Sequence, residues 1–160
     1  MRTPVDVTRL SDEHAGELLT LQRAAYVTEA QRYHDPNLPP LLQTLDELVA
    51  ELRLPAVTAL GARHGHRLVG AVRLRADGPV VHLGRLVVAP DRQGLGIGSV
   101  LLAECERAIA PETTEIQLFT GGRSDANIRL YERLGYRRQR DEPAGMYTIV
   151  HLTKVLAAAR

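Results

Sequence analysis

The chain has 160 residues, of which 44% are hydrophobic and 24% are charged, as in an ordinary globular domain. Its net charge of +1 excludes a strongly basic surface for nucleic acid or membranes, and its single cysteine excludes an internal disulfide. Because the N-terminal stretch lacks a signal-peptide core and no apolar run approaches a membrane span, we expect one cytoplasmic domain over residues 1–160, with a homodimer as one option.

The first part of the chain predicts one strand and two helices. Residues 5–10 alternate like a strand, and Ser11 is placed to N-cap a helix that runs to residue 30. Three prolines between residues 36 and 40 end this helix and predict a loop over 31–43. Thr44 and Glu47 then form a capping box for a second helix over 45–53.

The rest of the chain predicts a strand meander followed by alternating helices and strands. The hydrophobic period changes to two over residues 58–64, 67–76 and 80–89, which is typical of three antiparallel strands. The elements that follow are a helix at 99–109, a strand at 115–121, a helix at 125–134 and a strand at 145–156, with room for a short extra strand at 136–140. The order β-α-α-β-β-β-α-β-α-β predicts one mixed α/β domain.

A glycine-rich loop stands between the third strand of the meander and the next helix. Gly94, Gly96 and Gly98 occupy every second position there, and a helix N-terminus offers unpaired N–H groups to an anion. The loop therefore predicts a pyrophosphate site. It departs from the dinucleotide fingerprint because Ser99 stands where the third glycine is needed, and it lacks the Gly-Lys-Ser/Thr of a P-loop.

The segment Gln93-Gly94-Leu95-Gly96-Ile97-Gly98 matches the coenzyme A motif [Gln/Arg]-x-x-Gly-x-[Gly/Ala]. With "RLVVAPDRQGLGIGSVLL" around it and "SDANIRLYERLGY" downstream, the chain resembles the GNAT acetyltransferase superfamily. The resemblance implies a mixed, mostly antiparallel sheet of about six or seven strands with about four helices. It also implies a bulged strand whose backbone pairs with pantetheine. The cofactor-binding residues implied for acetyl-CoA are Leu86, Val88, Gln93, Gly94, Gly96, Ile97, Gly98, Ser99 and Asn127.

Tyr131 and Asn127 lie four residues apart, so they share one face of the predicted helix at 125–134. The resemblance implies that Tyr131 protonates the departing CoA thiolate and that Asn127 forms hydrogen bonds near the pantetheine. A phenol can supply the proton that a thiolate leaving group needs. The alternative roles are core packing for Tyr131 and a local helix cap for Asn127.

The base that accepts the proton of the amine is predicted on the strand at 80–89. A period of two places His82 and Gly84 on one face with Leu86 and Val88, and an imidazole suits the proton transfer. His82 could equally be a spectator, with Glu29, His34 or water as the base. Arg85, on the opposite face, is expected to be solvated or ion-paired. His64 and His66 lack a third ligand nearby, so we expect no metal.

These predictions favour an acetyl-CoA-dependent N-acetyltransferase that acts directly on a bound primary amine. Cys105 lies in an apolar helical pattern and is expected to be buried, so no acyl-enzyme is needed. A small-molecule acceptor is favoured, in a pocket formed by the 31–43 loop with Tyr33, His34, Leu38 and Leu41. The alternatives are a protein N-terminal or lysine acetyltransferase, a non-catalytic acyl-CoA-binding module, and a dinucleotide-binding domain.

Overall fold

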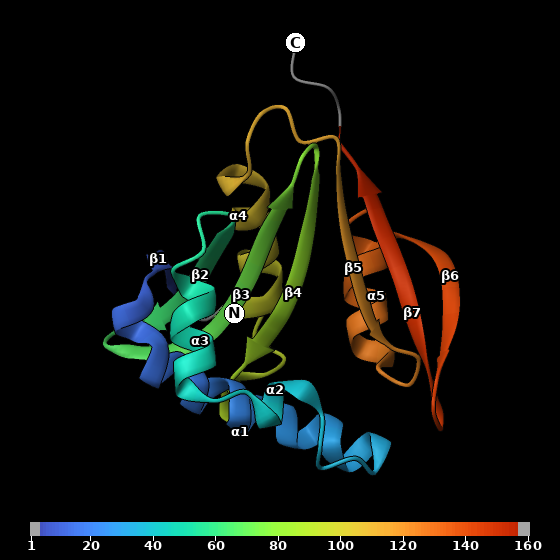
Figure 1. Ribbon diagram of the computed structural model, residues 1–160, viewed down its shortest axis with the longest axis horizontal. Coiled ribbons are helices and arrows are strands. Elements are labelled where there is room, and N and C mark those ends of the chain that lie inside the picture. Colours follow the sequence, from blue (N-terminus) through green and yellow to red (C-terminus); the bar gives the residue numbers. More distant parts are fainter. Residues whose placement is uncertain (1–3, 157–160) are drawn as a thin grey trace.

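The strands form one sheet in the order β1-β2-β3-β4-β5-β7-β6, shown in Figure 1. The structure is a computed structural model that describes residues 4–156. Its strands are β1 (Asp6–Leu10), β2 (Val57–His64), β3 (Arg67–Asp77), β4 (Val80–Val88), β5 (Glu115–Gly121), β6 (Arg137–Ala144) and β7 (Tyr147–Val155). Every neighbouring pair is antiparallel except β4 and β5, which are parallel. The predicted mixed, mostly antiparallel sheet is therefore confirmed.

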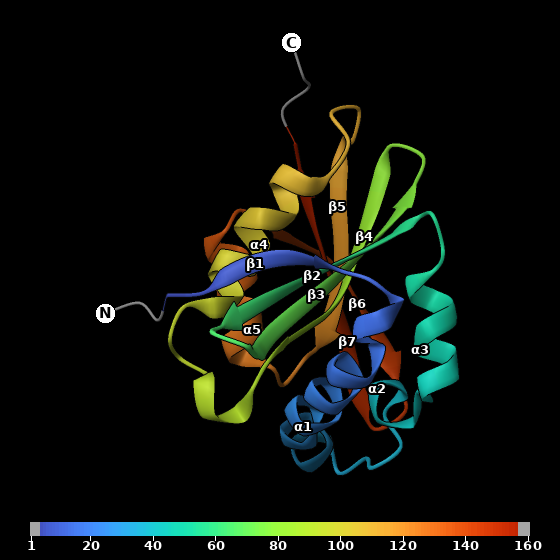
Figure 2. The same ribbon diagram turned by 90° about the vertical axis from the view of Figure 1, so that its left-hand side faces the viewer.

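Helices cover both faces of this sheet, as Figure 2 shows. They are α1 (Ala15–Tyr33), α2 (Pro39–Leu42), α3 (Leu45–Leu52), α4 (Ile97–Ala108) and α5 (Asp125–Arg133), with 3-10 turns at Asp12–His14 and Pro90–Arg92. None of the helices within residues 4–156 has both the length and the apolar composition needed to cross a membrane. Of the domain predicted over 1–160, residues 1–3 and 157–160 lie outside the described residues.

Two sequence predictions about these elements need correction. The 31–43 segment is not wholly a loop, because α1 continues to Tyr33 and Pro39 begins the short helix α2. Proline suits that first helical position, where its missing N–H is not needed. The suggested extra strand at 136–140 is a full edge strand, β6 (Arg137–Ala144), and it pairs with β7 along its length. Its polar sequence is exposed on both faces, so no hydrophobic alternation marks it.

Two apolar clusters, one on each face, hold the helices to the sheet. On one face α4 and α5 contribute buried residues such as Leu101 and Ile128, and on the other α1 and α3 contribute Leu18 and Leu48. Cys105 of α4 is fully buried, as predicted, and burial raises the pKa of its thiol to about 12. The thiol is therefore a core group without nucleophilic reactivity at neutral pH.

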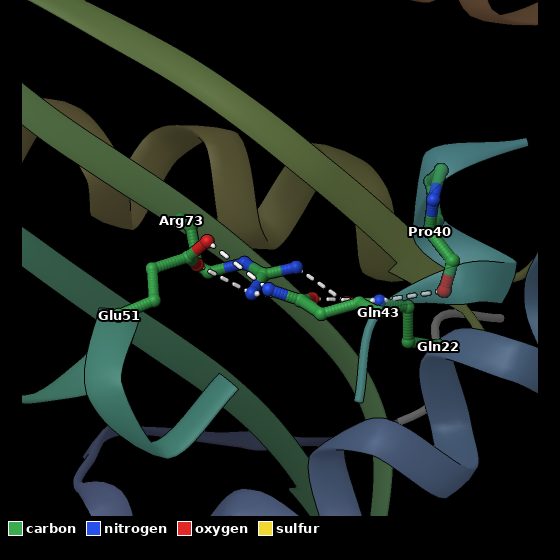
Figure 3. Close-up of polar contacts among 5 residues, drawn as sticks. All are labelled: Gln22, Pro40, Gln43, Glu51 and Arg73. Atoms are coloured by element: carbon green, nitrogen blue, oxygen red, sulfur yellow. Dashed lines mark hydrogen bonds and ion pairs between the residues drawn. The ribbon is translucent and has the colours of Figure 1, made fainter. Parts of the chain in front are cut away.

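One buried cation joins α1, α2 and α3 to the sheet. Arg73 of β3 is 6% exposed, and its guanidinium donates to Glu51 of α3 at 2.5 Å and to Gln22 of α1, as Figure 3 shows. Gln22 in turn donates to the Pro40 carbonyl at 2.8 Å and to Gln43 at 3.0 Å. Burial lowers the pKa of Arg73, and the charge of Glu51 opposes that effect. The network fixes residues 39–43 against the α1 face of the sheet.

Removing the Glu51 carboxylate should therefore destabilise the fold, because the Arg73 charge would stay buried without a counter-charge. We expect Glu51→Ala to lower the free energy of unfolding by about 3 kcal/mol, measured by urea denaturation. The matched control is Asp91→Ala, which breaks the exposed ion pair between Asp91 and Arg67. That change should have a much smaller effect. Equal losses in the two variants would contradict the structural role of the buried pair.

Candidate active site

A β-bulge in β4 shapes the candidate site. Gly84 pairs with Arg73 of β3 and Val87 pairs with Ala71, so two residues of β4, Arg85 and Leu86, lie opposite one residue of β3. Arg85 adopts a positive φ of 52°, a left-handed conformation that is uncommon for a residue with a side chain. Because of this extra residue, every later side chain of β4 points to the opposite face of the sheet from the one that strict alternation would give it.

The bulge corrects the prediction that His82, Gly84, Leu86 and Val88 share one face. Before the bulge, Leu83 packs in the α4 cluster; after it, Val87 packs in the α1 cluster. Leu86 and Val88 consequently lie against the α4 cluster, on the opposite face from His82. A strict period of two holds only while a strand keeps its register, and the bulge shifts that register by one residue.

Strand β4 parts from β5 just before the bulge. The two strands pair only at residues 80–82 of β4 with residues 115–117 of β5, and Figure 1 shows them diverging beyond that point. From Leu83 onward the edge of β4 that faces β5 has no strand partner within the described part of the chain. Backbone N–H and C=O groups need hydrogen-bond partners when they are shielded from water. An extended ligand that lies between the strands can supply them.

A cavity of about 700 Å³ lies in this opening. One side, here called the loop side, is lined by residues 93, 94 and 96–99 of the glycine loop together with Asn127 and Tyr131 of α5. The other, the α1 side, is lined by Tyr26, Glu29 and Tyr33 with Tyr147 of β7. The sequence-predicted residues that line the cavity are Leu86, Val88, Gln93, Gly94, Gly96, Ile97, Gly98, Ser99, Asn127 and Tyr131.

The glycines of this loop are required for two different reasons. Gly94 and Gly96 have φ values of 77° and 85°, so the backbone itself requires residues without a side chain there. Gly98 is helical, and a Cβ at that position would lie 3.3 Å from Leu130 of α5, so its absence lets α4 and α5 approach closely. Helix α4 begins directly after Gly96, and its first N–H groups are free to bind an anion.

The segment before this loop is anchored by an ion pair. Arg67 at the start of β3 donates to both carboxylate oxygens of Asp91, at 2.7 and 2.6 Å. This bidentate contact holds the pKa of Asp91 at about 2, so the carboxylate stays charged over the physiological range. The pair fixes the 3-10 turn of residues 90–92, from which the glycine loop departs.

Tyr131 is a buried phenol at the floor of the loop side. It is 5% exposed, and its ring meets that of Tyr136 edge-on, with centroids 5.7 Å apart. Burial is the main reason that the pKa of Tyr131 is raised, so its hydroxyl keeps its proton at neutral pH. Asn127 is half-buried one helical turn before it and also faces the cavity.

A chain of hydrogen bonds ties the α1 side to the start of α5. The backbone N–H of Arg123 donates to the Tyr33 hydroxyl at 3.0 Å, and that hydroxyl lies 2.8 Å from Ser124 Oγ. Ser124 donates to one oxygen of Glu29 at 2.9 Å, while Arg32 donates to the other at 2.8 Å. Ser124 occupies the N-cap position of α5, but its hydroxyl takes part in these hydrogen bonds instead of capping the helix.

Gly121 shows how closely these segments pack. A Cβ built on Gly121 would lie 2.0 Å from the Tyr33 hydroxyl, far inside van der Waals contact. The Tyr33 ring also packs against Tyr147 of β7, with centroids 4.9 Å apart. The end of α1 is therefore seated on β5 and β7, which sequence spacing could not reveal.

The other predicted residues of this region are divided between the cavity and the surface. Tyr33 and Leu38 line the cavity, but His34 and Leu41 do not. His82 lies outside it as well: its imidazole is 3.7 Å from Asp77, and it lines a second hollow of about 540 Å³ beside α3. Among the candidate residues for the base, Glu29 is the one that lines the cavity.

Sequence reasoning missed several cavity residues. Tyr26 could have been found, because it lies seven residues before Tyr33 and so shares its face of α1. Phe119 and Tyr147 carried no such signal, because only the pairing of β5 with β7 brings them to the opening. Arg85 was expected to be solvated or ion-paired, whereas it is half-buried, lines the cavity and forms no ion pair with the described residues.

Comparisons with known proteins agree with this geometry. The model of the Acetyltransferase (GNAT) family matches residues 17–136. An acetyltransferase from Sodalis glossinidius is 31% identical over 112 residues, covering 69% of this chain and 65%, just under two thirds, of that relative.

Two solved structures share the whole architecture. The PaiA N-acetyltransferase from Thermoplasma acidophilum, in complex with coenzyme A, has a TM-score of 0.77 at 19% identity, covering 96% of this chain and 99% of that one. The ribosomal-protein-S18-alanine N-acetyltransferase from Escherichia coli has a TM-score of 0.78 at 14% identity, covering 98% of this chain and 97% of that one. At these identities the similarity establishes a common fold.

Proposed function

This chain belongs to the GNAT acetyltransferase family, and from that premise we propose that it transfers the acetyl group of acetyl-CoA to a primary amine. The observation that carries the proposal is the opening between β4 and β5, which joins a glycine-loop helix terminus to a buried phenol in one cavity. We propose direct attack by the amine while both substrates are bound. Cys105 is buried in the core, which supports a mechanism without an acyl-enzyme.

The loop side suits the coenzyme. The N–H groups at the start of α4 would hold the pyrophosphate, and Gly94 and Gly96 keep side chains away from it. The unpaired edge of β4 at Leu86 and Val88 would pair with the amide groups of the pantetheine arm as an added strand does. This extended arm would lead the thioester from the glycine loop toward Tyr131.

Tyr131 is proposed as the general acid. The amine nitrogen forms a bond to the acetyl carbon, the carbon–sulfur bond breaks, and the electron pair of that bond remains on sulfur. Tyr131 donates its proton to this thiolate and recovers one from solvent. Burial keeps the phenol protonated until the sulfur acquires charge, and its position in the cavity favours catalysis over passive acyl-CoA binding.

Glu29 is proposed to accept the proton that the amine loses, through an ordered water. Its oxygens already accept from Arg32 and Ser124, yet a carboxylate oxygen can accept more than one hydrogen bond. The α1 side would hold the acceptor, which we propose to be a small molecule. A protein N-terminus or lysine side chain is the alternative acceptor.

The first test is binding of acetyl-CoA. Acetyl-CoA should raise the melting temperature, because at 100 times its Kd a ligand stabilises the folded state by about 2.7 kcal/mol. NAD at the same concentration should have no effect, since the loop lacks the third glycine of a dinucleotide site. Differential scanning fluorimetry measures both melting temperatures. A rise with NAD but not with acetyl-CoA would disprove the coenzyme assignment.

The second test concerns the general acid. Tyr131→Phe keeps the ring but removes its proton, so turnover should fall by about 10²-fold while acetyl-CoA still binds. Tyr136→Phe is the matched control, because it removes a hydroxyl from the buried ring that packs on Tyr131. The loss in Tyr131→Phe should shrink with a thioester whose leaving group is already a stable anion. Wild-type turnover in Tyr131→Phe would end the general-acid proposal.

The third test distinguishes the candidate bases. Glu29→Gln should lower turnover by about 10²-fold, because the amide cannot accept the proton that the amine loses. His82→Ala should leave turnover unchanged, since the imidazole lies outside the cavity. Stopped-flow or steady-state measurements of free CoA against pH provide the readout. An effect in His82→Ala alone would restore the histidine as the base.

A further inference from the structure

Arg85 stands where the cavity meets the second hollow. The bulge carries it to this junction: both spaces are lined by Leu83, Gly84, Arg85 and Phe119. Its side chain is half-buried rather than solvated, and it lies on the α1 side near the phenol of Tyr26. Burial raises the pKa of Tyr26, and the positive charges of Arg85 and Arg73 oppose that rise.

The charge of Arg85 has no counter-ion among residues 4–156. Arg32, also on the α1 side, is paired with Glu29, and the buried Arg73 is paired with Glu51. Arg85 forms an ion pair with none of the described carboxylates. Glu29 is the sole acidic residue in the lining, so cationic side chains outnumber it there.

The surroundings of Arg85 favour a further negative charge. Arg75 and His82 line the second hollow beside it. The acidic groups of that hollow are Glu51, which is held by Arg73, and Glu47, which accepts the Thr44 N–H in the capping box of α3. Both carboxylates that line this hollow thus have other partners, and a guanidinium offers paired N–H donors that match a carboxylate or phosphate.

The backbone at Arg85 gives an independent reason to look for a ligand. A side chain at φ 52° is strained, and glycine would occupy the position without that cost. Strained residues with side chains tend to persist where the side chain has a role in a site. At this position the chain places an arginine, a long cationic side chain, in the lining of the cavity.

We propose that Arg85 binds an anionic group of the acceptor, so that the acceptor is a small amine that also carries a carboxylate or phosphate. The inference rests on the proposed acetyl transfer. With the anion at Arg85 on the α1 side, the amine of the same molecule would face the opening between β4 and β5, where the thioester arrives. Arg85 would then determine acceptor specificity without taking part in the bond changes.

The experiment uses pairs of amines that differ only in the anionic group. Amino acids are compared with their carboxamides, and aminoalkyl phosphates with the corresponding amino alcohols, by release of free CoA. The preferred anionic member should have a kcat/KM about 10- to 100-fold higher than its neutral partner, as expected for one charge-assisted contact. The two series distinguish a carboxylate from a phosphate.

Variants assign the preference to Arg85. Arg85→Gln should abolish the preference by raising the KM for the anionic amine, and Arg85→Lys should retain part of it. Arg85→Gly removes the charge and suits the positive φ, so its melting temperature should not fall. Arg137→Gln, on the exposed strand β6, is the matched control and should keep the full preference.

The outcomes separate the two proposals. If acetyl-CoA stabilises the protein but neutral amines react as well as anionic ones, the Arg85 inference is wrong and the proposed function stands. If acetyl-CoA binds but neither the anionic nor the neutral amines are acetylated, the Arg85 inference is also wrong. A preference that survives Arg85→Gln would mean that another group binds the anion. Absence of acetyl-CoA binding would remove the proposed function itself.

Discussion

Strands β4 and β5 pair at only three positions and then separate, and the candidate site depends on that separation. Two strands of one sheet normally satisfy each other's backbone groups along their full length. Here the edge of β4 is left open beside a helix terminus that favours anions, so peptide groups and an electrostatic site become available in the same cavity. An extended ligand with a phosphate at one end suits both. The opening also lets α1 residues on one face reach a ligand bound from the other face.

The bulge at Arg85 and the open edge reinforce each other. The bulge lies just beyond His82, the last residue of β4 that pairs with β5, and a bulge increases the local twist of its strand. It also exchanges the faces of the strand, so that Leu86 and Val88 lie toward α4 while Val87 packs under α1. A single extra residue thereby positions the half-buried Arg85 and turns Leu86 and Val88 toward the α4 cluster.

On the face of the sheet that α1 and α3 cover, polar contacts as well as apolar burial hold the helices to the strands. Arg73, Glu51 and Gln22 form a buried network that connects three helices to β3. Such a network is stabilising only when its charge is compensated, and it specifies one arrangement of the segments that it joins. The residues between α1 and α3 are thereby fixed next to the cavity. The chain from Arg123 through Tyr33 and Ser124 to Glu29 performs the same role at the far end of α1.

The sequence by itself determined what depends on neighbours along the chain. The capping box of Thr44 and Glu47, the glycine-rich loop before α4, and the shared face of Asn127 and Tyr131 are all local features, and the sequence predicts each of them. Only the tertiary structure shows that Arg85 lines the cavity and that His82 lies outside it. Which face of the sheet Arg85 takes relative to His82 depends on the bulge, in which one residue of β3 lies opposite two residues of β4. The same reason explains Phe119, Tyr147 and β6, whose positions follow from strand pairings distant in sequence, where no local pattern records which edges meet.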